Sequence, residues 1–173
     1  MLPRGTFVLG GAASGKSAWA ENLLENSGLS LTYLATAEVL DGEMGQRVAR
    51  HRARRDARWR TVECPRDPAP VLEGFAPGQA VLIDCATLWL SNQMMAEADL
   101  GEARARLIAA LRATAARWVI VSNEVGQGIV PQNALSREFR EAQGRLNIAL
   151  AAEADLAVQV VAGLPQVLKG ALP

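Results

Sequence analysis

The sequence has few of the residues on which small secreted or metal-binding domains depend. Only two cysteines, Cys64 and Cys85, occur in 173 residues, and they do not form a paired metal-ligand motif. A chain of this length can bury about 70% of its unfolded surface, so disulfides are not needed for stability. We therefore expect a reduced, cytoplasmic protein, although the two cysteines leave open a single disulfide.

Long hydrophobic runs and an excess of charge are also missing. The first residues lead into a short apolar segment that ends at glycine, and no stretch approaches the roughly 20 apolar residues of a membrane span. The 18 Lys and Arg residues balance 18 Asp and Glu residues. A neutral chain argues against general electrostatic binding of nucleic acid. We expect no signal peptide, no membrane span and no nucleic-acid partner.

What is present is an alternation of short apolar segments with longer helical patterns. Continuous apolar strands separated by helices are typical of a mostly parallel sheet with helices on both faces. No repeat or linker interrupts the pattern, so we expect one α/β domain over residues 1–173. The expected strands are 6–9, 31–35, 59–62, 80–83, 118–121 and 156–161, and the expected helices are 16–26, 41–57, 67–75, 88–95, 101–116 and a long helix within 131–154.

The turn between the first expected strand and helix has the phosphate-binding pattern G-x-x-x-x-G-K-[ST]. Its glycines let backbone N–H groups surround phosphate oxygens, and the helix adds the positive end of its dipole. Lys16 is expected to reach the β- and γ-phosphates of a nucleoside triphosphate, and the Ser17 hydroxyl to bind Mg²⁺. An ordinary glycine-rich turn is the alternative, but the flanking elements favour a P-loop. The eight residues are Gly10, Gly11, Ala12, Ala13, Ser14, Gly15, Lys16 and Ser17.

Polar residues follow two of the later apolar strands. Asp84 ends one of them, which is the Walker-B arrangement of a metal-side carboxylate, and the alternative is an Asp that caps the next helix. Asn123 and Glu124 end another. Ligands gather at the carboxyl ends of parallel strands, so this pair could contact substrate or metal. It could equally tie down the loop at 126–128, and both interpretations stay open.

The only histidine, His51, lies in an arginine-rich segment. On a helix it would share one stripe with neighbouring arginines. Those arginines could hold a triphosphate while a neutral imidazole, favoured by the positive charge, attacks a phosphorus atom. The alternative is a solvent-exposed basic helix with an incidental histidine, which the residue pattern alone favours. The arginines of this stripe are Arg47, Arg54, Arg55 and Arg58.

Taken together, these segments resemble the bifunctional adenosylcobinamide kinase/adenosylcobinamide-phosphate guanylyltransferase family of cobalamin biosynthesis. The resemblance extends from Phe7 to Lys169. It is most specific around His51 and in the run Ser-Asn-Glu-Val-Gly-Gln-Gly-Ile-Val-Pro at 122–131. Many P-loop proteins share the phosphate loop, but few share these two segments.

The resemblance implies a RecA-like P-loop fold, a homotrimer and two reactions. One reaction transfers the γ-phosphoryl group of ATP or GTP to a hydroxyl of adenosylcobinamide, and the other transfers GMP from GTP to the resulting phosphate. The resemblance matches His51 to a nucleophile that carries GMP as a phosphoramidate. The P-loop motif itself predicts Lys16 as a catalytic residue and Mg²⁺ as cofactor, because both neutralise phosphate charge. The nucleotide contacts that it implies are residues 10–17, Thr36, Ala37, Glu38, Arg52, Ala53, Arg54, Arg55, Glu63 and Asp84.

Two residues depart from the family pattern. Ala13 stands where arginine is common, so one phosphate contact is in doubt, and Gln132 stands where glutamate is usual. Two other functions remain as alternatives, a P-loop kinase with a single activity and a nucleotide-dependent regulatory protein. Both leave His51 without a role. Trp59 and Trp89 are expected in the core or at a subunit interface, and Cys85 in the core.

Overall fold

The computed structural model describes residues 1–38 and 55–173. Within them lies a seven-stranded sheet with the strand order β3-β2-β4-β5-β1-β6-β7. Neighbouring strands are parallel except for the last pair, in which β7 runs antiparallel to β6. The strands are β1 (Gly5–Gly10), β2 (Ser30–Ala35), β3 (Trp59–Glu63), β4 (Gln79–Asp84), β5 (Arg117–Asn123), β6 (Leu156–Val161) and β7 (Leu164–Lys169).

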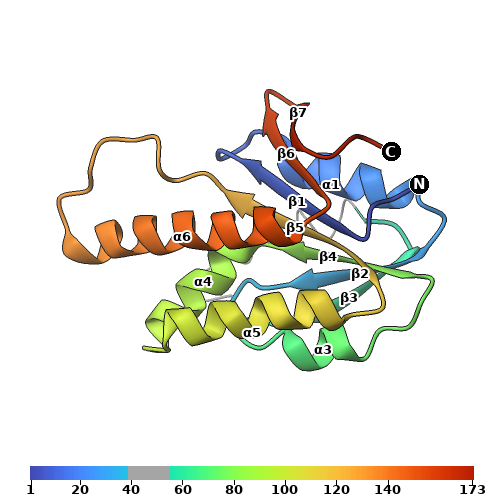
Figure 1. The fold of residues 1–173 in the computed structure, drawn as a ribbon, viewed down its shortest axis with the longest axis horizontal. Coiled ribbons are helices and arrows are strands. Elements are labelled where there is room, and N and C mark those ends of the chain that lie inside the picture. Colours follow the sequence, from blue (N-terminus) through green and yellow to red (C-terminus); the bar gives the residue numbers. More distant parts are fainter. Residues whose placement is uncertain (39–54) are drawn as a thin grey trace.

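Helices of the described part cover both faces of this sheet, as Figure 1 shows. One face packs against α3, α4, α5 and α6 through residues such as Ile83 and Trp118, and the other packs against α1 through Leu82 and Val119. Successive strand residues point to opposite faces, which divides each strand between two apolar clusters. The helices are α1 (Lys16–Glu25), α3 (Ala69–Glu73), α4 (Ala86–Met95), α5 (Leu100–Ala113) and α6 (Ala134–Glu153).

The predicted fold class is confirmed. The sheet is mostly parallel, helices lie on both faces, and a glycine-rich loop joins β1 to α1. β5 lies between β1 and β4, so the strand before the P-loop is not adjacent to the strand that ends at Asp84. This is a RecA-like P-loop arrangement.

The last strand, β7, was not predicted from the sequence. It contains Pro165, and proline within an apolar run argues against a strand except at the edge of a sheet. β7 is such an edge strand and is largely exposed. The hairpin to β6 turns through Ala162 and Gly163, which both have positive φ angles, 52° and 78°. Two such residues form a tight hairpin turn.

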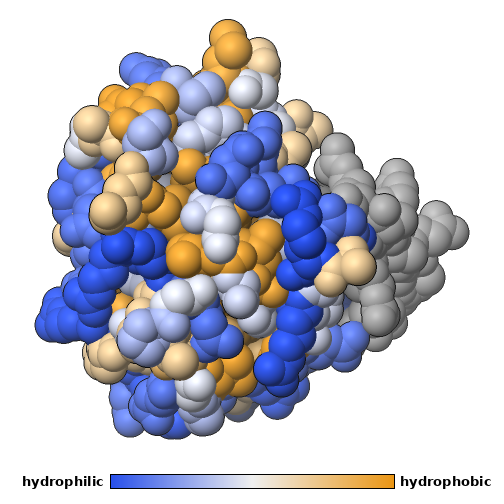
Figure 2. All heavy atoms as spheres, turned by 90° about the vertical axis from the view of Figure 1, so that its right-hand side faces the viewer, coloured by the Kyte–Doolittle hydropathy of each residue, from blue (hydrophilic) through white to orange (hydrophobic). Residues whose placement is uncertain are grey.

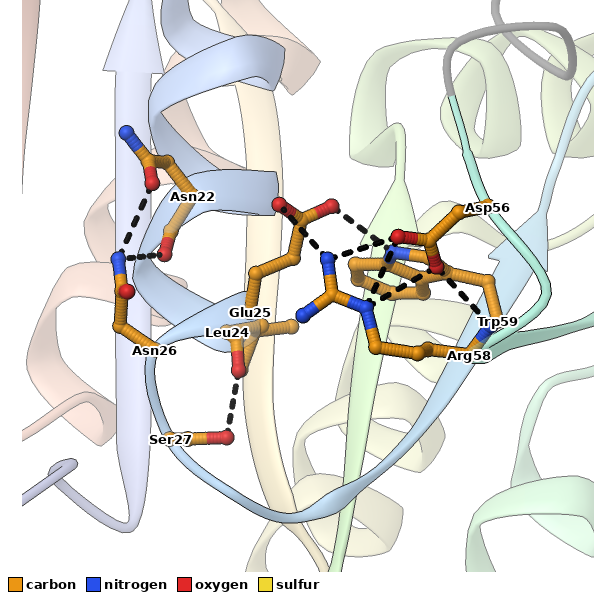
Figure 3. Close-up of polar contacts among 8 residues, drawn as sticks. All are labelled: Asn22, Leu24, Glu25, Asn26, Ser27, Asp56, Arg58 and Trp59. Carbon is orange, nitrogen blue, oxygen red and sulfur yellow. Dashed lines mark hydrogen bonds and ion pairs between the residues drawn. The ribbon is translucent and has the colours of Figure 1, made fainter.

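The predicted helix at 41–57 is wrong at its carboxyl end, and its other residues lie outside the described part. Arg55 and Asp56 are not helical. The Asp56 carboxylate accepts a hydrogen bond from the Arg58 backbone N–H at 2.9 Å, and the Trp59 N–H donates to the Asp56 carbonyl at 3.2 Å, which makes a turn into β3 (Figure 3). The predicted stripe fails there too, because the Arg55 side chain is 5% exposed and that of Arg58 is 55% exposed.

Two other helices differ from expectation near their ends. The sequence predicts a helix to residue 116 with Ala115 on its apolar stripe, but α5 ends at Ala113, and Ala115 lies beyond the helix and is exposed. α6 begins after Asn133, whose side chain caps the Ser136 N–H at 2.7 Å. Its first turn extends past the sheet, which leaves Leu135 58% exposed instead of buried (Figure 1). The sequence also predicts an apolar stripe on this helix, with Leu135, Phe139, Leu146 and Leu150 at helical spacing, and burial confirms it at Leu146 and Leu150.

The expected core residues are confirmed. Trp59, Trp89 and Cys85 are buried, and each indole finds a hydrogen-bond acceptor inside the chain. Trp59 Nε1 donates to Glu25 at 3.1 Å, and Trp89 Nε1 donates to the Arg66 carbonyl at 2.8 Å. A buried indole whose N–H is satisfied within the fold serves packing, and this argues against a role as a stacking surface for substrate.

Candidate active site

The loop between β1 and α1 has the geometry of a P-loop. Gly15 has a φ of +90°, a left-handed conformation that favours glycine. A Cβ at Gly10 would collide with the Ser14 hydroxyl and would lie 2.8 Å from the Val160 carbonyl oxygen. The Ser14 N–H donates to the Gly11 carbonyl at 3.3 Å, which closes a turn within the loop. Two of the motif glycines are therefore required by this local geometry.

Segments that are distant in sequence support the loop from two sides. The Gly163 N–H, in the turn between β6 and β7, donates to the Ser14 carbonyl at 2.8 Å. The Glu124 N–H, at the end of β5, donates to the Gly10 carbonyl at 3.0 Å. The hairpin that the sequence did not predict thus holds the phosphate loop in place.

The side chains of the P-loop differ in burial, and their predicted roles stay predictions. Lys16 is 9% exposed, and its Nζ donates to the Gly11 carbonyl at 2.9 Å, so the ammonium group lies within the loop. Ser17 is the second residue of α1 and is half-buried. Ala12 and Ala13 are exposed, and the short side chain of Ala13 supplies no positive charge there.

An open cavity of about 540 Å³ lies beside the loop. Residues from the P-loop, from the chain that follows β5, and from the end of β6 with its turn form its walls. It therefore lies where parallel strands end, which is where ligands of open α/β sheets gather. Its lining residues are Gly11, Ala12, Ala13, Ser14, Glu124, Val125, Gln127, Gly128, Gln159, Val160, Val161 and Ala162.

A larger cavity of about 660 Å³ lies elsewhere, on the side of the molecule where both termini lie. Figure 2 shows apolar surface framed by polar side chains on this side. Leu29 precedes β2 and Arg117 begins β5, so this cavity is at the amino edge of the sheet, away from the P-loop. None of the predicted site residues that the structure describes lines it, and we assign it no role in the chemistry.

Asp84 is half-buried at the carboxyl end of β4, on the same edge of the sheet as the P-loop. One of its carboxylate oxygens accepts a hydrogen bond from the Tyr33 hydroxyl at 3.1 Å. The turn after it is fixed by Thr36, whose hydroxyl accepts from the Cys85 N–H at 2.7 Å and donates to the Cys85 carbonyl at 2.8 Å. In the described structure the N-cap residue of α4 is Cys85 and no side chain caps this helix, so the capping interpretation of Asp84 is wrong.

Arg55 lies on the Asp84 side of this edge. Its guanidinium carbon is 3.4 Å from the centre of the Tyr33 ring, and its Nη1 is 3.7 Å from a Glu21 oxygen. The structure therefore places Arg55 next to the tyrosine that contacts Asp84. Its predicted contact with a nucleotide stays a prediction.

The other predicted contacts on β2 and β3 lie at the same edge. The Glu38 carboxylate accepts from Arg66 at 2.8 Å, and Ala37 beside it is half-buried. Glu63 ends β3 and is exposed, in register with Ala35. The remaining predicted residues, His51, Arg52, Ala53 and Arg54, lie outside the described residues.

Glu124 has two structural relationships. Its carboxylate accepts a hydrogen bond from the Gly126 N–H, so the proposed tie to the loop is confirmed. It also lines the cavity beside the P-loop, where a substrate contact stays a prediction. The Arg140 guanidinium, on α6, also binds this loop. It donates hydrogen bonds to the carbonyl of Gly126, to that of Gly128 at 2.9 Å and to that of Ile129 at 3.1 Å. The role of Arg140 could not be predicted, because no local pattern pairs it with a loop twelve residues away.

The donor set at this edge fits magnesium. Mg²⁺ prefers oxygen ligands and is usually held by one or two protein groups together with phosphates and waters. Ser17 and Asp84 offer such oxygens from the start of α1 and the end of β4. Over residues 1–38 and 55–173 no group of three or more His, Cys, Asp or Glu side chains forms a metal cage.

The model of the family described as cobinamide kinase / cobinamide phosphate guanyltransferase, CobU, matches residues 6–168. This chain belongs to that family. The family assignment made from the sequence is therefore confirmed, and the match extends from β1 to β7.

Two relatives in this family are similar along nearly their whole length. The bifunctional adenosylcobalamin biosynthesis protein CobP of Pseudomonas aeruginosa is 46% identical over 167 residues, covering 95% of this chain and 96% of the relative. The bifunctional adenosylcobalamin biosynthesis protein CobU of Salmonella typhimurium is 40% identical over 174 residues, with 91% and 96% covered.

Two solved structures have low similarity to this chain. The RadB recombinase has a TM-score of 0.48 at 17% identity, covering 91% of this chain and 74% of that chain. The P4 protein from bacteriophage phi6, in complex with ADP, has a TM-score of 0.46 at 15% identity, covering 94% and 52%. Among the helices of the described part, none is both long and apolar enough to cross a bilayer.

Proposed function

We propose that this chain phosphorylates adenosylcobinamide and then transfers GMP to the product, giving adenosyl-GDP-cobinamide and pyrophosphate. The observation that carries the proposal is a P-loop with Lys16 folded into it, on the sheet edge where β4 ends at Asp84. This arrangement serves nucleoside triphosphates, and membership of the CobU family supplies the acceptor.

In the first reaction the acceptor hydroxyl oxygen attacks the γ-phosphorus of ATP or GTP. The bond from that phosphorus to the β–γ bridging oxygen breaks, the nucleoside diphosphate leaves, and the hydroxyl proton is released. Such a transfer needs little covalent help, so positioning and charge stabilisation supply most of the catalysis. Lys16 and the loop N–H groups stabilise charge on the phosphate oxygens. Ser17 and Asp84 would hold Mg²⁺, which neutralises phosphate charge when it is bound.

In the second reaction attack falls on the α-phosphorus of GTP. An imidazole nitrogen of His51 forms a bond to that phosphorus, and the bond to the α–β bridging oxygen breaks, so pyrophosphate leaves. A phosphate oxygen of the phosphorylated acceptor then displaces the histidine and takes over GMP. The covalent step lets pyrophosphate depart before the second substrate arrives. Support for His51 comes from the family resemblance.

The guanylyl step is tested by incubating the purified chain with Mg²⁺ and GTP labelled at the α-phosphorus, followed by denaturing electrophoresis. We expect acid-labile label on the native chain and none on His51→Ala. Absence of label on a folded chain that binds GTP would remove His51 from the mechanism and leave a P-loop kinase.

The kinase step is tested separately, with γ-labelled ATP and adenosylcobinamide as the acceptor. Transfer of label to the acceptor supports the proposal. Slow release of labelled phosphate without transfer would instead favour a nucleotide-dependent regulatory protein.

We further propose that residues 1–173 form one domain, that the enzyme acts as a cytoplasmic homotrimer, and that it has no nucleic-acid partner. Size-exclusion chromatography with light scattering tests the trimer.

A further inference from the structure

The side chain that reaches Asp84 comes from Tyr33, the single tyrosine of the sequence. Tyr33 lies in β2, next to β4 in the sheet, and is 5% exposed. Its hydroxyl oxygen is 3.1 Å from Asp84 Oδ2. One oxygen of the carboxylate is thereby committed to the phenol, which restricts rotation of the carboxylate about its own axis.

Two neighbours hold the ring of Tyr33 in place. The Arg55 guanidinium lies over one face at 3.4 Å, a cation–π arrangement. The indole of Trp59 meets the ring edge-on, with centroids 6.4 Å apart and planes at 79°. A phenol ring held on its face and edge cannot swing away from Asp84 without disturbing both contacts.

Both neighbours are in turn attached to α1, the helix that begins at Lys16. Arg55 pairs with Glu21 at 3.7 Å, and the two side chains are 5% and 11% exposed. Trp59 Nε1 donates to Glu25 at 3.1 Å, as Figure 3 shows. The helix that follows the P-loop is therefore linked through Tyr33 to the carboxylate at the end of β4.

The Tyr33 hydroxyl is the donor in this hydrogen bond, because an ionised carboxylate can only accept. Burial raises the pKa of Tyr33 far above its ordinary value, and the negative charge of Asp84 raises it further, while Arg55 opposes the shift. An ordinary phenol keeps its proton at neutral pH, and the geometry has this hydroxyl as the donor. Tyr33 donates and Asp84 accepts.

We propose that Tyr33 is a positioning residue that orients the Asp84 carboxylate toward the metal-bound triphosphate. The Tyr33 hydroxyl donates its hydrogen bond to Asp84 Oδ2, which leaves Oδ1 to face the ion or one of its waters. The inference rests on the proposed function, because it takes the P-loop as the nucleotide site and Asp84 as its metal-side residue. Groups that orient metal ligands typically change metal affinity 10–100-fold when they are removed.

The test uses the full-length chain, a fluorescent mant-GTP probe and the variant Tyr33→Phe. This change removes one oxygen and keeps the ring between Arg55 and Trp59. We expect equal mant-GTP affinity in EDTA, and a Mg²⁺ midpoint for tightened binding that rises about tenfold in the variant. Asp84→Asn should raise the same midpoint. Adding Tyr33→Phe to it should change little, because the two residues act through one contact.

The matched control is Thr114→Val. Thr114 is buried, and its hydroxyl donates to the Leu72 carbonyl at 2.7 Å on the opposite face of the sheet. It therefore loses a buried hydroxyl without touching the site. We expect some loss of stability but an unchanged Mg²⁺ midpoint.

Three outcomes would overturn the inference. The first is a Mg²⁺ midpoint in Tyr33→Phe within twofold of the wild type. The second is a shift of equal size in Thr114→Val, and the third is full additivity with Asp84→Asn. A wild-type chain that binds no mant-GTP would overturn the proposed function, and the inference with it. If Tyr33→Phe does not fold, the Mg²⁺ midpoint of mant-GTP binding is measured in Asp84→Asn instead. An unchanged midpoint in that variant would show that Asp84 has no metal-side role, and Tyr33 would then have no metal ligand to orient.

Discussion

The P-loop and Asp84 lie on the same edge of the sheet, but the structure positions them in different ways. On the P-loop side, main-chain groups fix the conformation of the loop. Gly15 adopts a left-handed conformation, and backbone hydrogen bonds from Gly163 and Glu124 hold the loop. On the Asp84 side, side chains fix the position of the carboxylate. The Tyr33 hydroxyl donates to Asp84, and the Arg55 guanidinium lies over the Tyr33 ring. A main-chain site depends on glycine and turn geometry, and a side-chain site depends on the exact partner at each position.

This difference has a consequence for mutational sensitivity. The P-loop side should tolerate exchange of exposed side chains such as Ala13 but not the addition of a Cβ at its glycines. The Asp84 side should be sensitive to truncation of any of its buried polar side chains, because each leaves its partner without compensation.

The largest effect on stability is expected on the Asp84 side, for Arg55→Ala. The variant leaves Glu21 without this partner in a buried position and removes the cation over Tyr33. Breaking a buried ion pair by truncating one partner costs about 3–5 kcal/mol in the free energy of unfolding. Urea unfolding followed by circular dichroism measures this loss.

The matched control is Arg145→Ala. Arg145 pairs with Glu141 at 3.0 Å one turn apart on α6, and their side chains are 66% and 69% exposed. An exposed pair of this kind contributes about 0.3–0.5 kcal/mol. Similar losses in the two variants would contradict the buried link on the Asp84 side.

The second prediction concerns catalysis on the P-loop side. Lys16→Ala should reduce the rate of phosphoryl transfer about 10²–10³-fold, because one preorganised charge near the phosphates is removed. Stability should change little, since the hydrogen bond from Lys16 Nζ to the Gly11 carbonyl lies at the flexible end of the side chain. Steady-state kinetics with γ-labelled ATP, beside thermal unfolding, separates the two effects. A variant that loses activity only in proportion to unfolding would place Lys16 in a structural role.

The third prediction tests the main chain itself. Gly15→Ala puts a Cβ at a φ of +90° and 3.0 Å from the Cα of Gly163, so we expect a loss of about 1–3 kcal/mol and weaker nucleotide binding. Gly144→Ala is the control, because Gly144 lies in α6 with nothing within 4 Å of the added atom. It should gain about 0.4–1 kcal/mol. Equal behaviour of the two glycines in chemical denaturation would show that the P-loop geometry is not under steric control.

The same contrast explains what could be predicted from the sequence. The P-loop and the apolar strands depend on local spacing, so the glycines, Lys16 and the parallel sheet were all evident from short patterns. The placement of Tyr33 against Asp84 depends on residues 51 positions apart, for which a single sequence carries no signal. The β7 strand was missed because Pro165 obscured an edge strand whose pairing with β6 is non-local.

The alternatives left open at Asp84 and Glu124 illustrate the same limit. Sequence placed both acids correctly at strand ends, but a capping residue, a metal-side residue and a loop anchor share that position. The N-cap at Cys85 excludes the capping role of Asp84, and the hydrogen bond from the Gly126 N–H identifies Glu124 as a loop anchor. Strand ends can thus be predicted from pattern, and the partner of each end residue requires the fold.

The smallest expected effect concerns Arg140, whose side chain donates to backbone carbonyls of the loop at 126–129 and so combines a side-chain anchor with main-chain acceptors. Arg140→Ala should lower stability by about 1 kcal/mol, the usual net value of a lost hydrogen bond to carbonyl groups at an exposed position. The loop around Gly126–Gly128 should become more susceptible to proteolysis, since an anchor on α6 is lost. Among the described residues, the Glu124 contact is then the one left on Gly126. Limited proteolysis with mass spectrometry locates the cleavage, with Arg145→Ala as control.

Because this loop lines the cavity beside the P-loop, the Michaelis constant for the acceptor should rise more than the turnover number falls. An unchanged cleavage pattern would mean that Glu124 alone holds the loop, and main-chain contacts would then dominate this part of the site as well.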